Sequence, residues 1–335
     1  MTRRGDETAK GWGELELIRQ IRARAAKLGI GPGARSGVVV GIGDDCALLR
    51  VRPGEEIAVT TDLSIEGRHF QLEWHEPEAV GHRALARGLS DLAAMGARPV
   101  AAFVSLGLRR EMAARDQWVS RFYDGLLKLA HEYKTPLAGG DLAESPVVLA
   151  DIVLVGAVPR GKALRRSGAR AGDAIYVTGA LGGAAAGLEL LSRAGGAKKR
   201  EVESLRAHLS PQPRIAQGMW LRRRGAATAA IDLSDGLSTD LSHMCEESGL
   251  AAEVDAAAVP VAAGATLEQA LHGGEDYELL FTAAEGTRIP RTIAGVRVTR
   301  IGRMLRRGRG RPLLTLKNAD GSVQVMEARG WEHFK

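Results

Sequence analysis

The sequence predicts two domains, each of a mixed α/β or α+β class. With 335 residues the chain exceeds an ordinary single core and is long enough for two domains that each bury a substantial interior. Hydrophobic residues make up 45% and charged residues 26%, a balance typical of globular proteins. Helix and strand patterns alternate in both halves, which favours this fold class. A stretch rich in Gly, Arg and Lys at 159–173 predicts the boundary, with domains at residues 1–159 and 160–335.

The first half of the chain predicts a series of helices and strands. The helices are expected at residues 12–28, 78–95 and 113–133, and the strands at 38–40, 57–61, 100–108 and 147–158. In the second helix Leu85, Leu89 and Leu92 form a core stripe, and the charge of Asp91 beside that stripe needs a partner. The strand at 57–61 is expected to end at Asp62, and Gly-Gly-Asp at 139–141 is expected in a loop.

The second half predicts a similar alternation around glycine-rich turns. A strand at 174–178 leads into a turn with glycines at 179, 182 and 183 and then a helix to about Arg193. Another strand closes at Ile231, the segment Asp-Leu-Ser-Asp-Gly at 232–236 turns the chain, and a helix follows at 237–248. Residues 273–276 precede a strand at 277–282.

Composition argues against several classes of protein. The net charge is +6, but the excess is local, in a Gly-rich stretch that carries Arg303, Arg306, Arg307, Arg309 and Arg311. Without aromatic residues or a binding motif, this stretch predicts a solvated loop and no nucleic-acid site. No apolar run approaches the roughly 18 residues of a membrane helix, and no apolar segment follows the basic N-terminal residues, so the cytoplasm is the expected location. Cys46 and Cys245 predict neither a disulfide framework nor a zinc site.

Familiar nucleotide-binding loops are matched only in part. Residues 156–163 follow a predicted strand and resemble a Walker A loop. Ala163 stands where that loop needs Ser or Thr to hold magnesium, and Pro159 lacks one of the backbone donors that would bind phosphate. The turn at 179–183 lacks the G-x-G-x-x-G pattern, and close helix–strand packing explains it equally well. We therefore reject both loops as the nucleotide site.

Acidic residues at turns and strand ends are the remaining candidates. They are Asp44, Asp45, Asp62, Asp141, Asp232 and Asp235, with Asp91 on a helix. Each alone also suits an ordinary turn or cap. Two ionised carboxylates about 4 Å apart repel by roughly 4 kcal/mol at an effective dielectric of about 20, so a pocket with several would need cations. Oxygen ligands without histidine or thiolate favour magnesium or manganese, and magnesium commonly bridges carboxylates to phosphates. If the acids converge, they predict phosphoryl transfer from a nucleotide.

Two of the acid-bearing turns carry further detail. In Gly-Ile-Gly-Asp-Asp at 41–45, the glycines allow a sharp turn, Asp45 is the expected metal ligand and Asp44 is expected to be structural. The turn at 232–236 lies between a strand and a helix, where free N–H groups and the helix dipole favour a phosphate. Ser234 is equally explained as a helix N-cap.

These motifs together resemble the thiamine-monophosphate kinase family, which belongs to the aminoimidazole ribonucleotide synthetase-like superfamily. The matching segments are Gly-Ile-Gly-Asp-Asp-Cys-Ala-Leu-Leu at 41–49, Thr-Thr-Asp-Leu at 60–63, Gly-Arg-His-Phe at 67–70, Leu-Ser-Asp-Leu-Ala-Ala-Met-Gly-Ala at 89–97, Gly-Gly-Asp at 139–141, Ile-Asp-Leu-Ser-Asp-Gly-Leu at 231–237, Gly-Gly-Glu-Asp-Tyr-Glu-Leu at 273–279 and Gly-Trp-Glu-His-Phe at 330–334. They follow the family order over nearly the whole chain. Gly-Gly-Asp alone would carry no weight.

The resemblance implies a fold and an activity. The N-terminal α+β domain would carry the metal and ATP site and pair its sheet with its copy in a homodimer, and the C-terminal α/β domain would complete the nucleotide and substrate site. The γ-phosphate of ATP would pass to thiamine monophosphate, giving thiamine diphosphate and ADP. The acceptor is already a phosphate with a second pKa of about 6, so it is a competent nucleophile at neutral pH. No dedicated catalytic base is therefore assigned.

The resemblance also implies roles for single residues. Several magnesium ions would be held by Asp45, Thr60, Thr61, Asp62, Asp91, Asp141, Asp232 and Asp235. ATP would be contacted by Gly140, Asp141, Arg166 and Ser234, and the thiamine side by His69, Glu275 and Trp331. Leu142 departs from the family, which usually has threonine there, and the Arg-rich stretch at 303–311 is unusual.

Two alternatives remain open. One is another ATP-dependent enzyme of the superfamily. Selenophosphate synthetase would need a reactive cysteine in a Gly-rich N-terminal segment, whereas Cys46 lies inside the metal motif. The hydrogenase maturation factor would need a C-terminal cysteine, whereas this chain ends His-Phe-Lys. The other is a non-catalytic module that binds thiamine phosphate or a nucleotide. The presence of every carboxylate argues against the binding module.

Overall fold

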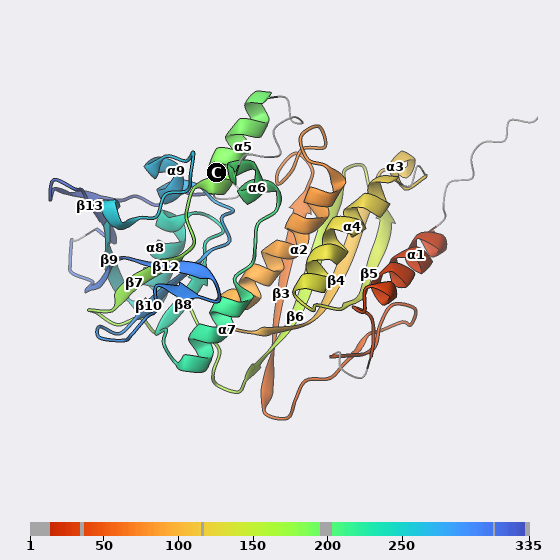
Figure 1. Ribbon diagram of the computed structural model, residues 1–335, viewed down its shortest axis with the longest axis horizontal. Coiled ribbons are helices and arrows are strands. Elements are labelled where there is room, and N and C mark those ends of the chain that lie inside the picture. The colour runs from red at the N-terminus through yellow and green to blue at the C-terminus, as the bar shows by residue number, and fades with distance from the viewer. Residues whose placement is uncertain (1–13, 34–36, 115–116, 195–202, 311, 332–335) are drawn as a thin grey trace, which may run out of the picture. The chain divides into compact units, whose positions relative to one another are not determined.

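The mixed α/β architecture is confirmed by the structure, a computed structural model in which residues 14–33, 37–114, 117–194, 203–310 and 312–331 are described (Figure 1). The chain forms two compact units. The first unit comprises residues 1–50, 61–85 and 100–153, and the second comprises residues 51–60, 86–99 and 154–335. Among the described residues, no helix has the length and apolarity needed to cross a membrane.

The N-terminal half builds a four-stranded sheet with the strand order β3-β6-β4-β5. Its strands are β3 (Glu55–Ile65), β4 (Arg98–Leu108), β5 (Leu137–Glu144) and β6 (Leu149–Pro159). The helices are α1 (Glu14–Lys27), α2 (Pro77–Ala94), α3 (Arg110–Ala114) and α4 (Gln117–Glu132), and a small ladder joins β1 (Val38–Val40) to β2 (Leu48–Leu49). In Figure 1, α2 and α4 lie side by side over the sheet.

Two glycines allow α2 and α4 to approach closely. A Cβ at Gly81 would lie 2.0 Å from the carbonyl oxygen of Phe122, and one at Gly125 would lie 1.9 Å from that of Glu78. Both distances are far below a van der Waals contact, so only glycine fits at these positions in the present packing. The close approach buries Phe122, Leu126 and other apolar side chains of α4.

The second unit contains an eight-stranded sheet whose continuous order is β14-β13-β9-β12-β7-β10-β8, with β11 paired to β12. The strands are β7 (Ala174–Thr178), β8 (Ala229–Asp232), β9 (Leu250–Asp255), β10 (Leu279–Ala283), β11 (Thr292–Ile293), β12 (Val296–Arg306), β13 (Leu314–Lys317) and β14 (Val323–Val325). The helices are α5 (Gly183–Ala194), α6 (Glu203–Leu209), α7 (Ile215–Arg224), α8 (Leu237–Ser248) and α9 (Leu267–His272), with a short 3₁₀ helix at Ala256–Ala258.

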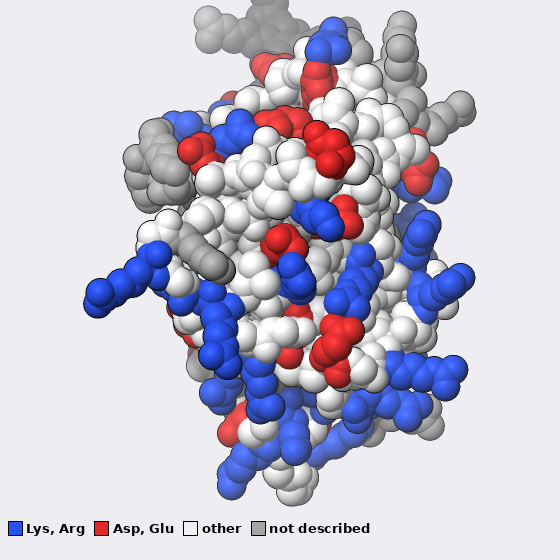
Figure 2. All heavy atoms as spheres, turned by 90° about the vertical axis from the view of Figure 1, so that its left-hand side faces the viewer, with Lys and Arg blue, Asp and Glu red and all other residues white. Residues whose placement is uncertain are grey.

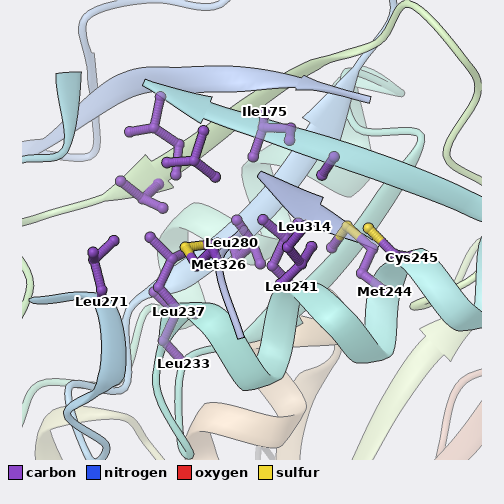
Figure 3. Close-up of a cluster of buried hydrophobic side chains, with 14 of the residues drawn as sticks. Ile175, Leu233, Leu237, Leu241, Met244, Cys245, Leu271, Leu280, Leu314 and Met326 are labelled. Atoms are coloured by element: carbon purple, nitrogen blue, oxygen red, sulfur yellow. The ribbon is translucent and has the colours of Figure 1, made fainter. Parts of the chain in front are cut away.

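The core of the second unit lies between α8 and this sheet (Figure 3). Leu237, Leu241 and Met244 of α8 are buried in one cluster with Leu280 of β10 and residues of the other central strands. Cys245 belongs to the same cluster and is fully buried. The helix therefore has a fixed position on the sheet, and so does the turn that precedes it.

Several predicted elements agree with the structure and others need correction. The predictions for β7 and α8 match residue for residue. Asp62 lies inside β3, however, and residues 139–141 lie inside β5 instead of in a loop. Both strands are edges of their sheet, where polar side chains and glycines are tolerated because one side of the strand faces no partner strand. The helix predicted at 113–133 is replaced by α3 and α4, and residues 115–116 lie outside the described part.

The Arg-rich stretch is also only partly a loop. Arg303 and Arg306 belong to β12, and Arg303 pairs with Glu253 at 3.0 Å. Arg307 and Arg309 are exposed beyond the strand, and Arg311 lies outside the described residues. Figure 2 shows Lys and Arg side chains gathered over the lower part of this view, with a few Asp and Glu side chains among them. Buried positions recur at every third residue of β12, so the stretch lacks the two-residue alternation by which a sequence predicts a strand.

The α2–α4 packing gives a test of the fold. Gly125→Ala is expected to lower the free energy of unfolding by about 1 to 3 kcal/mol, because the added methyl group must push the two helices apart. Urea unfolding followed by circular dichroism measures the change. Gly31→Ala is the control, since its Cβ would meet only ordinary contacts at 3.8 Å. Equal midpoints for both variants would show that the helices do not pack this closely.

Candidate functional site

The predicted acidic residues fall into two sets, one in each unit. Asp45, Asp62 and Asp141 belong to the first unit, and Asp91, Asp232 and Asp235 belong to the second. Among the described residues, no three His, Cys, Asp or Glu side chains converge as a site for a single metal ion. The two sets therefore have different neighbours.

In the first unit, Asp45 and Asp141 line a cavity of about 580 Å³. Its walls are mostly apolar and come from α1, β4, β5, α4 and the turn after β1. They include Leu15, Ile18, Ile21, Ile42, Phe103, Val104, Tyr123 and Leu137, together with Cys46 and residues 139–142. The cavity thus combines apolar walls with carboxylates and glycine backbone.

Glycines in β5 shape one wall of this cavity. Gly140 has a φ of +146°, and a Cβ there would lie 1.9 Å from the carbonyl oxygen of Val104. A Cβ at Gly139 would lie 2.9 Å from the ring of Phe103. Only glycine brings the strand this close to β4. The carboxylate of the following Asp141 accepts the N–H of Leu142 at 2.9 Å.

The turn after β1 presents Asp45 beside this cavity. Asp44 Oδ1 accepts the N–H of Asp45 at 2.9 Å, which is how aspartate ordinarily stabilises a turn. The side chain of Arg22 lies against Gly43, where a Cβ would be 2.3 Å from its guanidinium nitrogen Nη1. Glycine at this position therefore leaves room for Arg22.

Two further predicted residues of the first unit lie on or next to β3. The side chain of Thr61 is exposed and, because strand side chains alternate, points to the opposite face from Asp62. His69 Nδ1 accepts the N–H of Ile65 at 3.1 Å, so a neutral His69 ring carries its proton on Nε2. Buried Arg83 donates to the carbonyl of His69 at 3.2 Å. The imidazole is therefore held as a hydrogen-bond donor at Nε2.

In the second unit, α2 supplies contacts to two of the acids. Buried Ser90 donates its hydroxyl hydrogen to Asp232 Oδ2 at 2.7 Å, and Asp232 itself is only 3% exposed. The neighbouring Asp91 accepts a hydrogen bond from the Thr60 hydroxyl. Thr60 and Asp91, both predicted as metal ligands, are thus in contact through this hydrogen bond.

The turn at 232–236 differs from the expected phosphate-binding turn. The N–H groups of Asp235 and Gly236 donate to Asp240 Oδ2 at 3.1 and 3.0 Å, so these two donors are already used. The N-cap of α8 is Gly236, and Ser234 does not cap the helix. Burial, followed by the charges of Asp232 and Asp235, raises the pKa of Asp240 well above its ordinary value. Sequence reasoning missed Asp240 because its role depends on how the turn folds back.

The segment at 273–278 is bound to the same turn. Glu275 N–H donates to the Ser234 carbonyl at 2.8 Å, and Tyr277 N–H donates to the Leu233 carbonyl at 2.9 Å. Glu275 and Tyr277 have φ values of +67° and +52°, a region that costs a non-glycine residue about 1 to 3 kcal/mol. The carboxylate of Asp276 accepts N–H groups of Gly182 and Ala184 at the start of α5, and burial raises its pKa to about 7.

Further contacts of this segment are buried. Glu278 is 5% exposed at its side chain and forms an ion pair with Arg214. It also accepts the Thr178 hydroxyl at 2.6 Å. Glu275 Oε2 lies 3.6 Å from Nδ1 of buried His208. The surrounding structure thus fixes the strained backbone and with it the position of Glu275.

The C-terminal segment reaches this turn as well. Trp331 N–H donates to the Asp235 carbonyl at 3.1 Å, and the Trp331 side chain is 50% exposed. The turn at 232–236 therefore brings together Ser234, Asp235, Glu275 and Trp331. Arg166 lies in an exposed loop before β7, where its carbonyl accepts the Ser248 hydroxyl at 3.2 Å.

Some residues of these sites had no signal in the sequence. Phe103, Tyr123 and Ile18 line the cavity but lie on three different elements. Ser90 could have been suspected from its place beside Asp91, whereas nothing in the sequence indicates the contact between Asp240 and the turn. Burial raises the pKa of Tyr123, so this phenol stays neutral.

Comparison with protein families assigns the class. The family described as AIR synthase related protein, N-terminal domain, matches residues 43–160, and AIR synthase related protein, C-terminal domain, matches residues 170–313. Together the two matches cover most of the chain. The chain is thus an AIR synthase related protein.

Individual relatives narrow the class. Thiamine-monophosphate kinase of Salmonella typhimurium (strain LT2) is 39% identical over 96% of this chain and 98% of its own length. The crystal structure of thiamine-monophosphate kinase from Stenotrophomonas maltophilia K279a has a TM-score of 0.79 at 37% identity and covers 93% of this chain and 98% of its own. AaThiL complexed with AMPPCP and TMP has a TM-score of 0.74 at 32% identity and covers 99% of both chains. The chain belongs to the thiamine-monophosphate kinase family.

Proposed function

We propose that this protein transfers the γ-phosphate of ATP to the phosphate of thiamine monophosphate, giving thiamine diphosphate and ADP. The observation that carries the proposal is the 39% identity to a thiamine-monophosphate kinase over 96% of this chain. The solved structure of the relative AaThiL is a complex with TMP and with AMPPCP, an analogue of ATP. These two ligands agree with the two substrates proposed here. The protein would therefore be a phosphotransferase of thiamine biosynthesis.

The proposed phosphoryl transfer does not need a strong catalytic base. The acceptor is a phosphate monoester whose second pKa is about 6, so it is largely dianionic at neutral pH and already nucleophilic. The remaining barrier lies in bringing two anions together in line and in neutralising the charge of the transferred group. We accordingly assign no residue as a base. We propose that the protein acts mainly by positioning the two substrates in line.

We propose magnesium as the counter-ion in this reaction. The residues proposed to hold it are Asp45, Thr60, Thr61, Asp62, Asp91, Asp141, Asp232 and Asp235. Their hard oxygen donors, without nearby thiolate or imidazole ligands in the set, suit magnesium. This ion is commonly held by one or two carboxylates together with substrate phosphates, so a cluster of three acids is not required. When bound, it would neutralise charge on the phosphates.

We propose that the cavity of the first unit receives the adenine ring of ATP. Its apolar walls suit a planar ring, and Gly140 and Asp141, both proposed ATP contacts, line it. Arg166 and Ser234 are proposed for the phosphates, since an arginine fork matches phosphate oxygens. It stays a prediction that residues 1–159 carry the metal and ATP site and that residues 160–335 complete the nucleotide and substrate site.

His69, Glu275 and Trp331 are proposed for the thiamine side. Trp331, which is 50% exposed, would stack on an aromatic ring, and the carboxylate of Glu275 would attract a cationic ring. Nε2 of His69 would donate a hydrogen bond. The fixed backbone at Glu275 suits a residue that must hold a substrate in one orientation.

We further propose a homodimer that pairs through the N-terminal sheet. β3 is an edge strand of 11 residues, and Ile57, Val59 and Leu63 expose large apolar side chains at 57%, 61% and 44%. A long edge strand with exposed apolar residues invites pairing with another chain. A cytoplasmic location also stays a prediction.

A coupled assay of ADP release with ATP, magnesium and thiamine monophosphate tests the proposed reaction. Asp232→Asn is expected to lower kcat about 100-fold or more, because one metal ligand is lost. Its metal-free unfolding midpoint should hardly change, because the substitution also relieves repulsion with Asp235 and Asp240. Asp320→Asn, in an exposed turn, is the matched control. Tight binding of both ligands without ADP release would instead indicate a binding module.

Filling the cavity tests its role. Ile18→Trp is expected to raise KM for ATP about 10-fold, because the larger side chain occupies space needed by the ring. KM for thiamine monophosphate should stay the same. Arg19→Trp places the same side chain on the solvent side of α1, where the arginine side chain is 72% exposed, and serves as the control. An unchanged KM for ATP in Ile18→Trp would remove the nucleotide from this cavity.

The proposed dimer is tested by Val59→Lys. A lysine in the middle of β3 is expected to give a folded monomer, because pairing would bury its charge. Sedimentation equilibrium measures the mass. Val323→Lys makes the same change on β14, another exposed edge strand, and should leave the mass unchanged. A dimer that survives Val59→Lys would place the interface elsewhere.

A further inference from the structure

The segment that carries Trp331 is attached to the second unit by a defined path. After β14, Met326 is buried in the core, and its N–H donates to the Leu314 carbonyl at 3.1 Å. The chain then has no regular secondary structure through residue 331 and runs along the first turn of α8. Gly330 N–H donates to the hydroxyl of Thr239 at 3.0 Å.

Four side chains fasten this segment, and we call them the clasp: Ser238 of α8, Glu268 and His272 of α9, and Arg329. Nδ1 of His272 lies 2.8 Å from the hydroxyl oxygen of Ser238, and its Nε2 lies 3.2 Å from a guanidinium nitrogen of Arg329. Arg329 also contacts Glu268 at 3.3 Å, and its backbone N–H donates to Ser238 Oγ at 3.4 Å. Arg329, the member of the clasp on the C-terminal segment, lies two residues before Trp331.

The geometry fixes the protonation state that the clasp needs. Arg329 has donors only, so Nε2 of His272 must carry a lone pair and Nδ1 must carry the proton that goes to Ser238. Burial is the first cause that lowers the pKa of His272, Arg329 lowers it further, and Glu268 opposes both. The imidazole is therefore neutral at pH 7, and its side chain is only 9% exposed.

Close approach at Gly330 adds a steric condition. A Cβ there would lie 2.0 Å from the Asp235 carbonyl oxygen and 2.5 Å from the Thr239 hydroxyl. The segment can thus lie against the turn at 232–236 only with glycine at this position. The clasp and Gly330 together fix the position of the Trp331 backbone beside the turn.

We propose that Arg329 and His272 are positioning residues that hold the C-terminal segment against α8 and thereby place Trp331 beside the turn at 232–236. Neither residue is among those assigned to substrate, nucleotide or metal. The effect on catalysis rests on the proposed function, because it requires Trp331 to contact the thiamine side. The attachment itself does not depend on that function.

The attachment is tested by ¹⁹F NMR on protein labelled with 5-fluorotryptophan. The chain has 5 tryptophans, and Trp331→Phe identifies the signal of Trp331. Arg329→Gln and His272→Asn are each expected to shift this signal alone toward that of a solvent-exposed indole. His272→Asn keeps a donor for Ser238, but its shorter side chain has no atom at the position of Nε2 to accept from Arg329. Arg300→Gln removes a comparable exposed ion pair, with Glu285, and should leave the signal unchanged.

Two further measurements use the same signal. Gly330→Ala should shift it as well, while Gly33→Ala, where a Cβ has open space, should not. In the unmodified protein the signal should move toward the exposed position as the pH falls below 6.5, since protonated His272 cannot accept from Arg329 and repels it. This titration should be missing in His272→Asn. A Trp331 signal that is unchanged in both Arg329→Gln and His272→Asn would overturn the proposal.

Kinetics separate the clasp from the proposed function. Arg329→Gln is expected to raise KM for thiamine monophosphate about 3- to 10-fold, the loss of about one aromatic contact, with kcat and KM for ATP unchanged. A shifted signal with an unchanged KM would support the clasp and count against substrate contact by Trp331. An unshifted signal with a raised KM would count against the clasp.

Discussion

The turn at 232–236 is the constraint on which the second unit's candidate site depends. Its carbonyl groups at Leu233, Ser234 and Asp235 accept the N–H groups of Tyr277, Glu275 and Trp331. Its own amides are bound by Asp240. The turn is thus a junction between two segments far apart in the sequence, and its position follows from the packing of α8 on the sheet. Every residue proposed for the thiamine side in this unit is placed through these backbone contacts.

The same turn concentrates negative charge. Burial, followed by the charges of Asp232 and Asp235, raises the pKa of Asp240 above its ordinary value. Ser90 donates a hydrogen bond to Asp232. Carboxylates that lie close together disfavour the ionisation of all of them, so the arrangement favours either a proton on one acid or a cation nearby. The arrangement therefore agrees with the metal binding proposed for Asp232 and Asp235, whereas Asp240 binds the amides of the turn.

Sequence reasoning predicted the elements whose patterns are local and missed relations between distant segments. α8 and β7 follow from apolar periodicity and flanking glycines. Asp62 and residues 139–141 were misplaced because Gly and Asp usually mark turns, whereas edge strands also accept them. The cavity could not be predicted, since its walls come from four elements and a turn. The free amides expected at the turn were occupied by Asp240, a residue whose side chain points back over its own helix start. The structure places Ser234, Asp235, Glu275 and Trp331 at one turn, and the roles that the family motifs imply for them stay predictions.

The left-handed backbone at Glu275 and Tyr277 has a consequence for how this protein could be improved. Glycine at 275 would relieve the strain but remove the carboxylate, whereas glycine at 277 would also remove a buried ring, a loss of about 3 to 5 kcal/mol that exceeds the strain of about 1 to 3 kcal/mol. It would also give the segment freedom that its neighbours now deny it. The left-handed backbone is thus kept for the side chains that it carries, and engineering for heat resistance would do better to leave both positions alone.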